Sequence, residues 1–341
     1  MVGALVVDGE GVIVGRGWHE AAGGPHAEVH ALRNAGSLAR NATLYCTLEP
    51  CCHTGRTPPC APRIVDAGIR RVVVAIEDPN PIVSGRGIDH LRTKGIDVAS
   101  GVQRDRAAEL NRPFFTRIRK GRPFVTLKIA LSLDARVAHR AGARTRLTSD
   151  AANRLVHRER AEVDAIAVGA GTILADDPLL TARGIYRGRP LVRVIFDRAL
   201  RTPSTANVLS TLAAGPVIIV TTASSVLEHR RAAAALQAAG AQLQIHETPQ
   251  GARPRIVDAL GRLAADGIMS VVIEGGPELH RAAWDEQAVD RVQLFVAPAT
   301  VGPAGLPWLP IEALALACLV DTRVEPVGDD VMIEGYVHRA D

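Results

Sequence analysis

The chain has 341 residues, of which 47% are hydrophobic and 22% charged, a length that predicts two domains rather than one compact core. Its net charge is only +4 and 3% of its residues are aromatic, which argues against a dedicated nucleic-acid-binding protein. No apolar run approaches the roughly 18 residues of a membrane span, and the first residues do not form a signal peptide. We therefore expect a soluble cytoplasmic protein.

Predicted strands and helices alternate along the first third of the chain. Apolar runs at 2–7 and 12–16 flank a turn and predict a hairpin. The later predicted elements are helices over 26–34, 61–67 and 105–120 and strands over 43–48 and 72–76. This order predicts an α/β domain with partly parallel strands. Gly121-Arg122-Pro123 ends the last helix, so we place the domain boundary there, which gives domains 1–120 and 121–341.

The second domain has the same alternation and is also predicted to be α/β. We expect strands over 124–131, 165–168, 192–196, 217–220, 271–273 and 292–297, and helices over 151–162 and 227–239.

Four of the five cysteines lie within fifteen residues of one another, and two of them complete a pattern with Pro25-His26-Ala27-Glu28. His26, Cys51 and Cys60 offer three nitrogen and sulfur ligands, which would leave a tetrahedral zinc ion one open position for a water molecule. Glu28, in the same helical turn as His26, would carry the water's proton to a leaving amine. This arrangement is typical of zinc deaminases.

Two other interpretations of this pattern stay open at this point. A structural zinc site would recruit Cys52 as a fourth ligand, although neighbouring side chains point in different directions. Alternatively, His26 begins a helix and the cysteines are small core residues, as we expect for Cys46 in its predicted strand.

The segments Pro25–Leu32, Thr47–Cys60 and Asp78-Pro79-Asn80-Pro81 resemble the bifunctional riboflavin-biosynthesis deaminase/reductase family. The long spacing between Cys51 and Cys60, with Gly-Arg-Thr-Pro-Pro inside it, is much more specific than a Cys-x-x-Cys motif and favours this family over cytidine and tRNA adenosine deaminases. The resemblance implies a cytidine-deaminase-like α/β/α domain in which His26, Cys51 and Cys60 hold zinc and Glu28 is the proton shuttle. It also implies contacts to an aminopyrimidine ribose phosphate from His53, Arg56, Asp78 and Asn80.

The start of the chain departs from the family pattern. The family normally has a helix and an Asn-Pro-x-Val-Gly turn before the first strand, whereas this sequence begins at Met1-Val2-Gly3. Because a missing helix would expose apolar sheet surface, we expect lower stability or activity of the deaminase domain.

Three segments of the second domain have features of a nucleotide site. Glu274-Gly275-Gly276-Pro277 lies between a predicted strand and a helix, which makes an anion site. Gly169-Ala170-Gly171-Thr172 is predicted as a loop whose backbone amides approach a phosphate or a cofactor ring. Strand alternation over 128–134 places Lys128, Ala130, Ser132 and Asp134 on one face. Plain turns and a solvated strand edge are the alternatives.

The same three segments resemble the reductase domain of the family, which implies a dihydrofolate-reductase-like α/β fold that uses NADPH. Carried over residue by residue, the cofactor contacts are Ala130, Arg146, Thr172, Arg198, Gly276, Pro277, Glu278, Leu279, His280, Arg281 and Ala282. The implied contacts to the ribosylamino-uracil phosphate are Arg144, Arg160, Asp176, Leu180, Arg183 and Glu274. An ordinary solvated charge is the alternative for Arg160. Lys128 and Asp176 are the candidates for polar assistance to hydride transfer.

Two positions depart from the reductase pattern. Ala135 replaces a family glycine and would cost roughly 1 kcal/mol if a left-handed turn is required there. Arg146 stands where the family has an aromatic residue and either leaves the cofactor less shielded or pairs with a phosphate.

Together these features predict a bifunctional enzyme of riboflavin synthesis. It would deaminate a diaminopyrimidinone ribosylamino phosphate with zinc and then reduce the ribosyl chain with NADPH. One alternative is a reductase whose first domain has become structural. A second is a nucleic-acid base deaminase with an appended nucleotide-binding domain. We expect a homo-oligomer, a dimer or tetramer, with the apolar segment 311–320 as a candidate interface.

Overall fold

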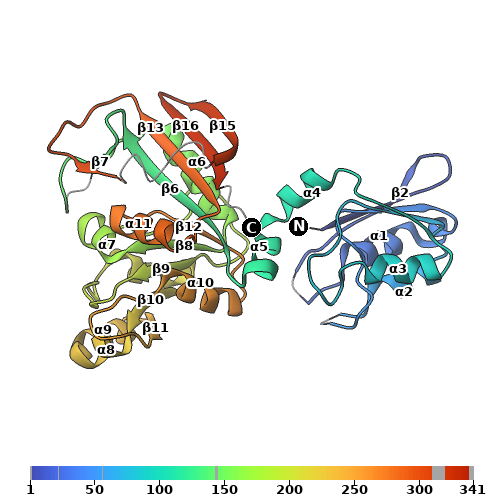
Figure 1. Cartoon of the computed structure of the whole chain (residues 1–341), viewed down its shortest axis with the longest axis horizontal. Coiled ribbons are helices and arrows are strands. Elements are labelled where there is room, and N and C mark those ends of the chain that lie inside the picture. Colours follow the sequence, from blue (N-terminus) through green and yellow to red (C-terminus); the bar gives the residue numbers. More distant parts are fainter. Residues whose placement is uncertain (1, 22, 56, 143–144, 309–318, 338–341) are drawn as a thin grey trace. The chain divides into compact units, whose positions relative to one another are not determined.

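The computed structural model describes residues 2–21, 23–55, 57–142, 145–308 and 319–337. The chain divides into two compact units, Met1–Lys120 and Gly121–Asp341 (Figure 1). The predicted contacts Arg56 and Arg144, and most of the candidate interface segment 311–320, lie outside the described residues. Within the described part of the chain, every helix is too short or too polar to cross a membrane.

Unit 1 is a mixed sheet with its helices packed mainly on one face. Its elements are β1 (Gly3–Val7), β2 (Ile13–Trp18), α1 (Ala27–Ala35), η1 (Gly36–Ala39), β3 (Thr43–Cys46), α2 (Cys60–Asp66), β4 (Arg71–Val74), α3 (Arg86–Thr93), β5 (Asp97–Ser100), α4 (Arg104–Leu110) and α5 (Arg112–Lys120). The strand order is β2-β1-β3-β4-β5, with β1 antiparallel to both neighbours and β3, β4 and β5 parallel. This sheet confirms the predicted hairpin and the partly parallel pairing.

Alanines and aliphatic side chains of α1, α2 and α3 share one buried cluster with those of β1, β3 and β4. Two glycines of β2 let α1 approach the sheet closely. A Cβ at Gly15 would lie 2.3 Å from the carbonyl oxygen of Ala31, and one at Gly17 would lie 2.1 Å from that of Ala27. Because no other residue type fits such gaps, these glycines fix the position of α1, which directly follows the predicted metal ligand His26 and carries the predicted proton shuttle Glu28 in its first turn.

Unit 2 is a larger α/β assembly. Its elements are β6 (Phe124–Ser132), β7 (Arg136–Ala138), α6 (Asp150–Glu162), β8 (Ala165–Gly169), α7 (Ala170–Asp176), β9 (Val192–Phe196), η2 (Asn207–Ala214), β10 (Val217–Thr222), α8 (Ala223–Glu228), α9 (Arg230–Ala238), β11 (Gln242–His246), α10 (Ile256–Ala265), β12 (Ser270–Ile273), α11 (Pro277–Asp285), β13 (Arg291–Ala297), β14 (Leu306–Pro307), β15 (Leu319–Val327) and β16 (Asp330–Val337).

Nine of these strands form one sheet in the order β11-β10-β9-β8-β12-β6-β13-β16-β15. The strands from β11 to β13 are parallel, and β16 and β15 add an antiparallel edge. Alternate residues of the central strands enter two different cores. On one face of the sheet the core includes side chains of α10 and α11. On the other face, side chains of α9 and η2 pack against one part of the sheet and those of α6 against another. The parallel strands therefore end at a common edge between two helical layers.

The predicted elements are broadly confirmed, but two predicted helices are each divided. The helix predicted over 105–120 is α4 followed by α5, with Asn111 at φ −112° between them. Pro113 explains this break, because it lacks an N–H and its ring would collide with the preceding turn. The helix predicted over 227–239 is α8 followed by α9, with a non-helical backbone at His229.

A buried ion pair fixes the first residues of unit 2. The Arg122 guanidinium donates to both carboxylate oxygens of Asp290, which also accepts the backbone N–H of Val125. The side chains of Arg122 and Asp290 are 7% and 8% exposed. Because each charge is desolvated, removing one partner leaves the other buried without compensation.

Asp290→Ala is therefore expected to lower the free energy of unfolding by about 3 kcal/mol. Asp285→Ala is the matched control, because it removes a carboxylate from an exposed pair with Arg281 and should change stability by less than about 1 kcal/mol. Urea unfolding of the two variants measures the difference. Equal effects would contradict the importance of the buried pair.

Candidate functional site

Unit 1 brings three predicted metal ligands together. His26 precedes α1, Cys51 lies in the loop after β3, and Cys60 begins α2. Their ligand atoms all lie within 4.8 Å of one another, and Nδ1 of His26 is 3.2 Å from Sγ of Cys60 and 3.4 Å from Sγ of Cys51. The Cys60 thiol and the His26 ring lower the pKa of Cys51 to about 4, so its sulfur is a thiolate. One nitrogen and two sulfurs are a suitable donor set for zinc.

The neighbours of these ligands hold them in place. The backbone N–H groups of Cys60 and Ala61 both donate to the carbonyl oxygen of Cys51 at 3.0 Å, which orients the first turn of α2 toward Cys51. Thr57 Oγ1 lies 3.0 Å from Nε2 of His26 and so leaves Nδ1 facing the sulfurs. Such a contact to the outer nitrogen is typical of a histidine that binds metal. Sequence reasoning did not identify Thr57.

Glu28 lies beside this cluster and is 3% exposed. Burial raises the pKa of Glu28 to about 7. Its Oε2 atom is buried and has no hydrogen-bond partner among the described residues. A carboxyl group that is buried, incompletely satisfied and able to exchange a proton near neutral pH is suited to general acid–base chemistry.

The remaining described contacts of the first predicted site are His53, Asp78 and Asn80, and Asp78 is near enough to Cys51 and His53 for their charges to affect it. Asp78 is 8% exposed, and burial together with the charges of Glu49 and Cys51 raises its pKa, whereas His53 lowers it. The Asp78 side chain accepts the backbone N–H of Asn80 at 2.8 Å. Nδ1 of His53 is buried and has no partner in the described ranges.

Unit 2 contains a cleft of about 1140 Å³ at the edge where its parallel strands end. Residues that directly follow β8, β9 and β12 line it, as expected for open α/β sheets, where ligands bind at the carboxyl ends of the strands. Twelve predicted site residues line this cleft: Lys128, Ala130, Arg160, Thr172, Asp176, Leu180, Arg198, Glu274, Gly276, Pro277, Glu278 and Leu279.

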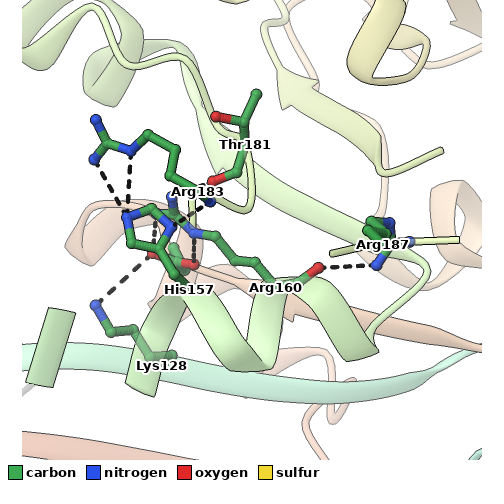
Figure 2. A network of polar contacts seen from close by, with 7 residues as sticks. Lys128, His157, Arg160, Thr181, Arg183 and Arg187 are labelled. Carbon is green, nitrogen blue, oxygen red and sulfur yellow. Dashed lines mark hydrogen bonds and ion pairs between the residues drawn. The ribbon is translucent and has the colours of Figure 1, made fainter. Parts of the chain in front are cut away.

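Three predicted residues form a buried charged network in the cleft, which Figure 2 shows around Lys128 and Arg160. The guanidinium of Arg160 donates to both oxygens of Glu274 at 2.7 and 2.8 Å, and Nζ of Lys128 lies 3.7 Å from Glu274. Burial opposes the charge of Glu274, but Arg160 and Lys128 lower its pKa to about 2. Burial lowers the pKa of Lys128. Because the Arg160 side chain is 15% exposed and paired with Glu274, Arg160 is not a solvated surface charge.

Next to this network, α6 presents His157 to Arg183. The backbone N–H of Arg183 donates to Nδ1 of His157 at 3.2 Å, and Nε of Arg183 lies 3.4 Å from Nε2 of the same ring (Figure 2). Burial and the charges of Arg160 and Arg183 lower the pKa of His157. The lowered pKa favours the neutral ring, which accepts the backbone N–H of Arg183.

Five other predicted contacts do not line the cleft. His280 is fully buried and accepts a hydrogen bond from Nε1 of Trp308 at 3.0 Å. Ala282 is 3% exposed, and Arg281 pairs with Asp285. Arg146 forms an exposed ion pair with Asp150. Arg183 contacts His157 and does not line the cleft. Conversely, Arg140, Arg201 and Arg253 line the cleft and were not predicted.

Two segments differ from their predicted local structure. Gly169-Ala170-Gly171-Thr172 is not a loop, because Gly169 precedes α7 and the next three residues form its first turn. The predicted polar strand face is interrupted, since β6 ends at Ser132 and the Asp134 carboxylate accepts from the Ser132 hydroxyl at 2.6 Å and from two backbone N–H groups. These hydrogen bonds lower the pKa of Asp134. Only Lys128 and Ala130 of that face line the cleft.

Ala135 follows this turn and has φ +57°. The left-handed conformation that the family's glycine would adopt freely is therefore present with alanine, at a cost of roughly 1 kcal/mol.

Both units match known families. Residues 123–333 match the RibD C-terminal domain, and residues 1–76 match the cytidine and deoxycytidylate deaminase zinc-binding region. The sequence is 41% identical over 338 residues to the riboflavin biosynthesis protein RibD of Aquifex aeolicus, an alignment that covers 97% of this chain and 90% of that protein. It is 37% identical to RibD of Escherichia coli, covering 97% of this chain and 92% of that protein.

Solved structures give the same result. The chain is similar to RibD of Acinetobacter baumannii, with a TM-score of 0.83 and 33% identity over 99% of this chain and 92% of that one. It is also similar to a diaminohydroxyphosphoribosylaminopyrimidine deaminase/5-amino-6-(5-phosphoribosylamino)uracil reductase of Thermotoga maritima, with a TM-score of 0.81 and 32% identity over 99% and 92% of the two chains.

Proposed function

The chain belongs to the RibD family of bifunctional riboflavin-biosynthesis enzymes, and we propose that its two units act in succession on one pyrimidine ribosylamino phosphate. Unit 1 is a deaminase of the zinc-binding kind and unit 2 a reductase. The proposed reactions are deamination of the 2,5-diamino-6-ribosylamino-4(3H)-pyrimidinone 5′-phosphate and then reduction of 5-amino-6-(5-phosphoribosylamino)uracil.

The observation that carries the proposal for unit 1 is the buried Oε2 of Glu28 beside the His26–Cys51–Cys60 cluster. These three residues would hold a zinc ion, which lowers the pKa of a water molecule when bound. Glu28 would accept a proton as water adds to the ring carbon that carries the amine, and would return it as ammonia leaves. Its buried position keeps bulk water from competing for that proton.

The reductase reaction is assigned to the cleft of unit 2. A cleft of about 1140 Å³ with glycines at two helix starts and several arginines fits a large anionic dinucleotide such as NADPH. NADPH, when bound, would supply the hydride that reduces C1′ of the sugar. Lys128 would donate a proton or a hydrogen bond to the substrate, because burial makes its ammonium a better acid. Asp176, which also lines the cleft, is the second candidate for this role.

The two alternative functions are disfavoured. A nucleic-acid base deaminase with a regulatory domain does not explain relatives named RibD that align along nearly the whole chain. A purely structural first unit does not explain why the metal ligands are accompanied by a buried carboxyl group with an unsatisfied oxygen.

Replacing Glu28 separates metal binding from proton transfer. Glu28→Gln should retain zinc and lower the deaminase kcat by about 10²- to 10⁴-fold, because the amide cannot carry the proton. Ammonia release and zinc content measure the two properties. Reduction of the uracil compound by the same variant is the internal control and should be unchanged. A deaminase rate close to that of the unaltered protein would contradict the role of Glu28.

A variant of unit 2 should impair reduction and leave deamination unchanged. Lys128→Met keeps the Arg160–Glu274 pair and should lower the rate of NADPH oxidation with the uracil compound by about 10²-fold, since the acid is lost. Deaminase activity should stay at its original value. Unchanged NADPH oxidation would exclude Lys128 as the proton donor and would leave Asp176 as the remaining candidate.

A further inference from the structure

Glu49 lies between β3 and Cys51 and is a buried carboxylate that belongs neither to the predicted metal ligands nor to the proposed proton-transfer group. It is 3% exposed. Its Oε2 accepts the backbone N–H groups of Asp78 at 3.2 Å and Gly85 at 3.0 Å. Its Oε1 accepts those of Gly87 at 2.9 Å and Ile88 at 3.2 Å. One side chain therefore satisfies four backbone donors of the segment that follows β4.

These hydrogen bonds connect two pieces of chain that diverge after neighbouring parallel strands. The backbone N–H of Glu49 donates to the carbonyl oxygen of Ile76 at 3.0 Å, which continues the pairing of β3 and β4 beyond their last residues. After this point one chain proceeds to Cys51 and the other to Asp78 and α3. Beyond this point the Glu49 carboxylate, rather than backbone carbonyl groups, accepts the N–H groups of the segment that follows β4.

The contact with α3 is close as well as polar. A Cβ at Gly87 would lie 1.9 Å from the carbonyl oxygen of Pro50, so only glycine permits this approach. Glu49 Oε1 is bonded to the first turn of α3, where a negative charge is favoured by the helix dipole. The position of α3 is therefore fixed relative to Pro50, the residue before the metal ligand Cys51.

The segment that Glu49 holds contains the two proposed substrate contacts. Asp78 donates its backbone N–H to Glu49, while its own carboxylate accepts from the N–H of Asn80. The Asn80 side chain in turn accepts the N–H of Ile82 at 3.1 Å. The orientation of both polar side chains thus depends on a chain of hydrogen bonds that starts at Glu49.

We propose that Glu49 is a positioning residue of the deaminase, which holds the Asp78–Asn80 loop at a fixed place relative to Cys51 and the metal cluster. The inference rests on the proposed deaminase function of unit 1. A carboxylate is required because all four partners are donors. In Glu49→Gln the side-chain NH₂ group would face two N–H groups, so half of the hydrogen bonds are lost and the loop moves away from the cluster.

Glu49→Gln should therefore raise the KM of deamination by about tenfold or more, with a smaller effect on kcat and with zinc retained. Glu77→Gln is the matched control, because Glu77 is an exposed glutamate in the same loop and its replacement removes the same charge. The readouts are KM and kcat from ammonia release, zinc content, and NADPH-dependent reduction of the uracil compound, which reports an intact second unit.

A double-mutant cycle with Asn80→Ala tests whether Glu49 acts through the loop. If it does, Glu49→Gln has a smaller effect on KM in the Asn80→Ala background than in the unaltered protein. Additive effects, an unchanged KM, or loss of zinc from Glu49→Gln would each overturn the positioning role. If the unaltered protein releases no ammonia, the proposed deaminase function fails and the role of Glu49 fails with it. If the unaltered protein is active and Glu49→Gln has the same KM, only the positioning role of Glu49 fails.

Discussion

A buried glutamate at the end of a parallel strand organises the functional region of each unit. Glu49 follows β3 and accepts four backbone N–H groups, and Glu274 follows β12 and pairs with Arg160 and Lys128. Parallel strands leave unpaired donors where they diverge, and burying an ionised carboxylate costs free energy unless donors or cations pair with it. The donors around each glutamate therefore fix the loops that surround it.

This constraint explains how one chain carries two different reactions. In unit 1 the Glu49 carboxylate accepts four backbone N–H groups, whereas Glu28, the residue that we propose for proton transfer, has an oxygen without a partner among the described residues. In unit 2 Arg160 bonds both oxygens of Glu274, and Lys128, the proton donor that we propose, lies farther from that carboxylate and lines the cleft.

The sequence predicted the α/β class and the metal cluster because these depend on local patterns. His26, Cys51 and Cys60 belong to short motifs that lie at the ends of predicted elements. Thr57 and Glu49 act through contacts between segments distant in sequence, and strand or helix periodicity carries no signal for such contacts. Of the predicted cofactor contacts 276–282, only residues 276–279 line the cleft. Successive residues of a helix point in different directions, and His280 and Ala282 are buried in the core. Arg201 was detectable in principle, since it follows a predicted parallel strand.

NADPH oxidation by the zinc-loaded protein, with the diaminopyrimidinone ribose phosphate and the already deaminated uracil compound as parallel substrates, tests the central claim most directly. The account predicts oxidation with both compounds, because unit 1 converts the first into the substrate of unit 2. Oxidation with the uracil compound alone would contradict an active deaminase unit. No oxidation with either compound would contradict the proposed succession of reactions as a whole.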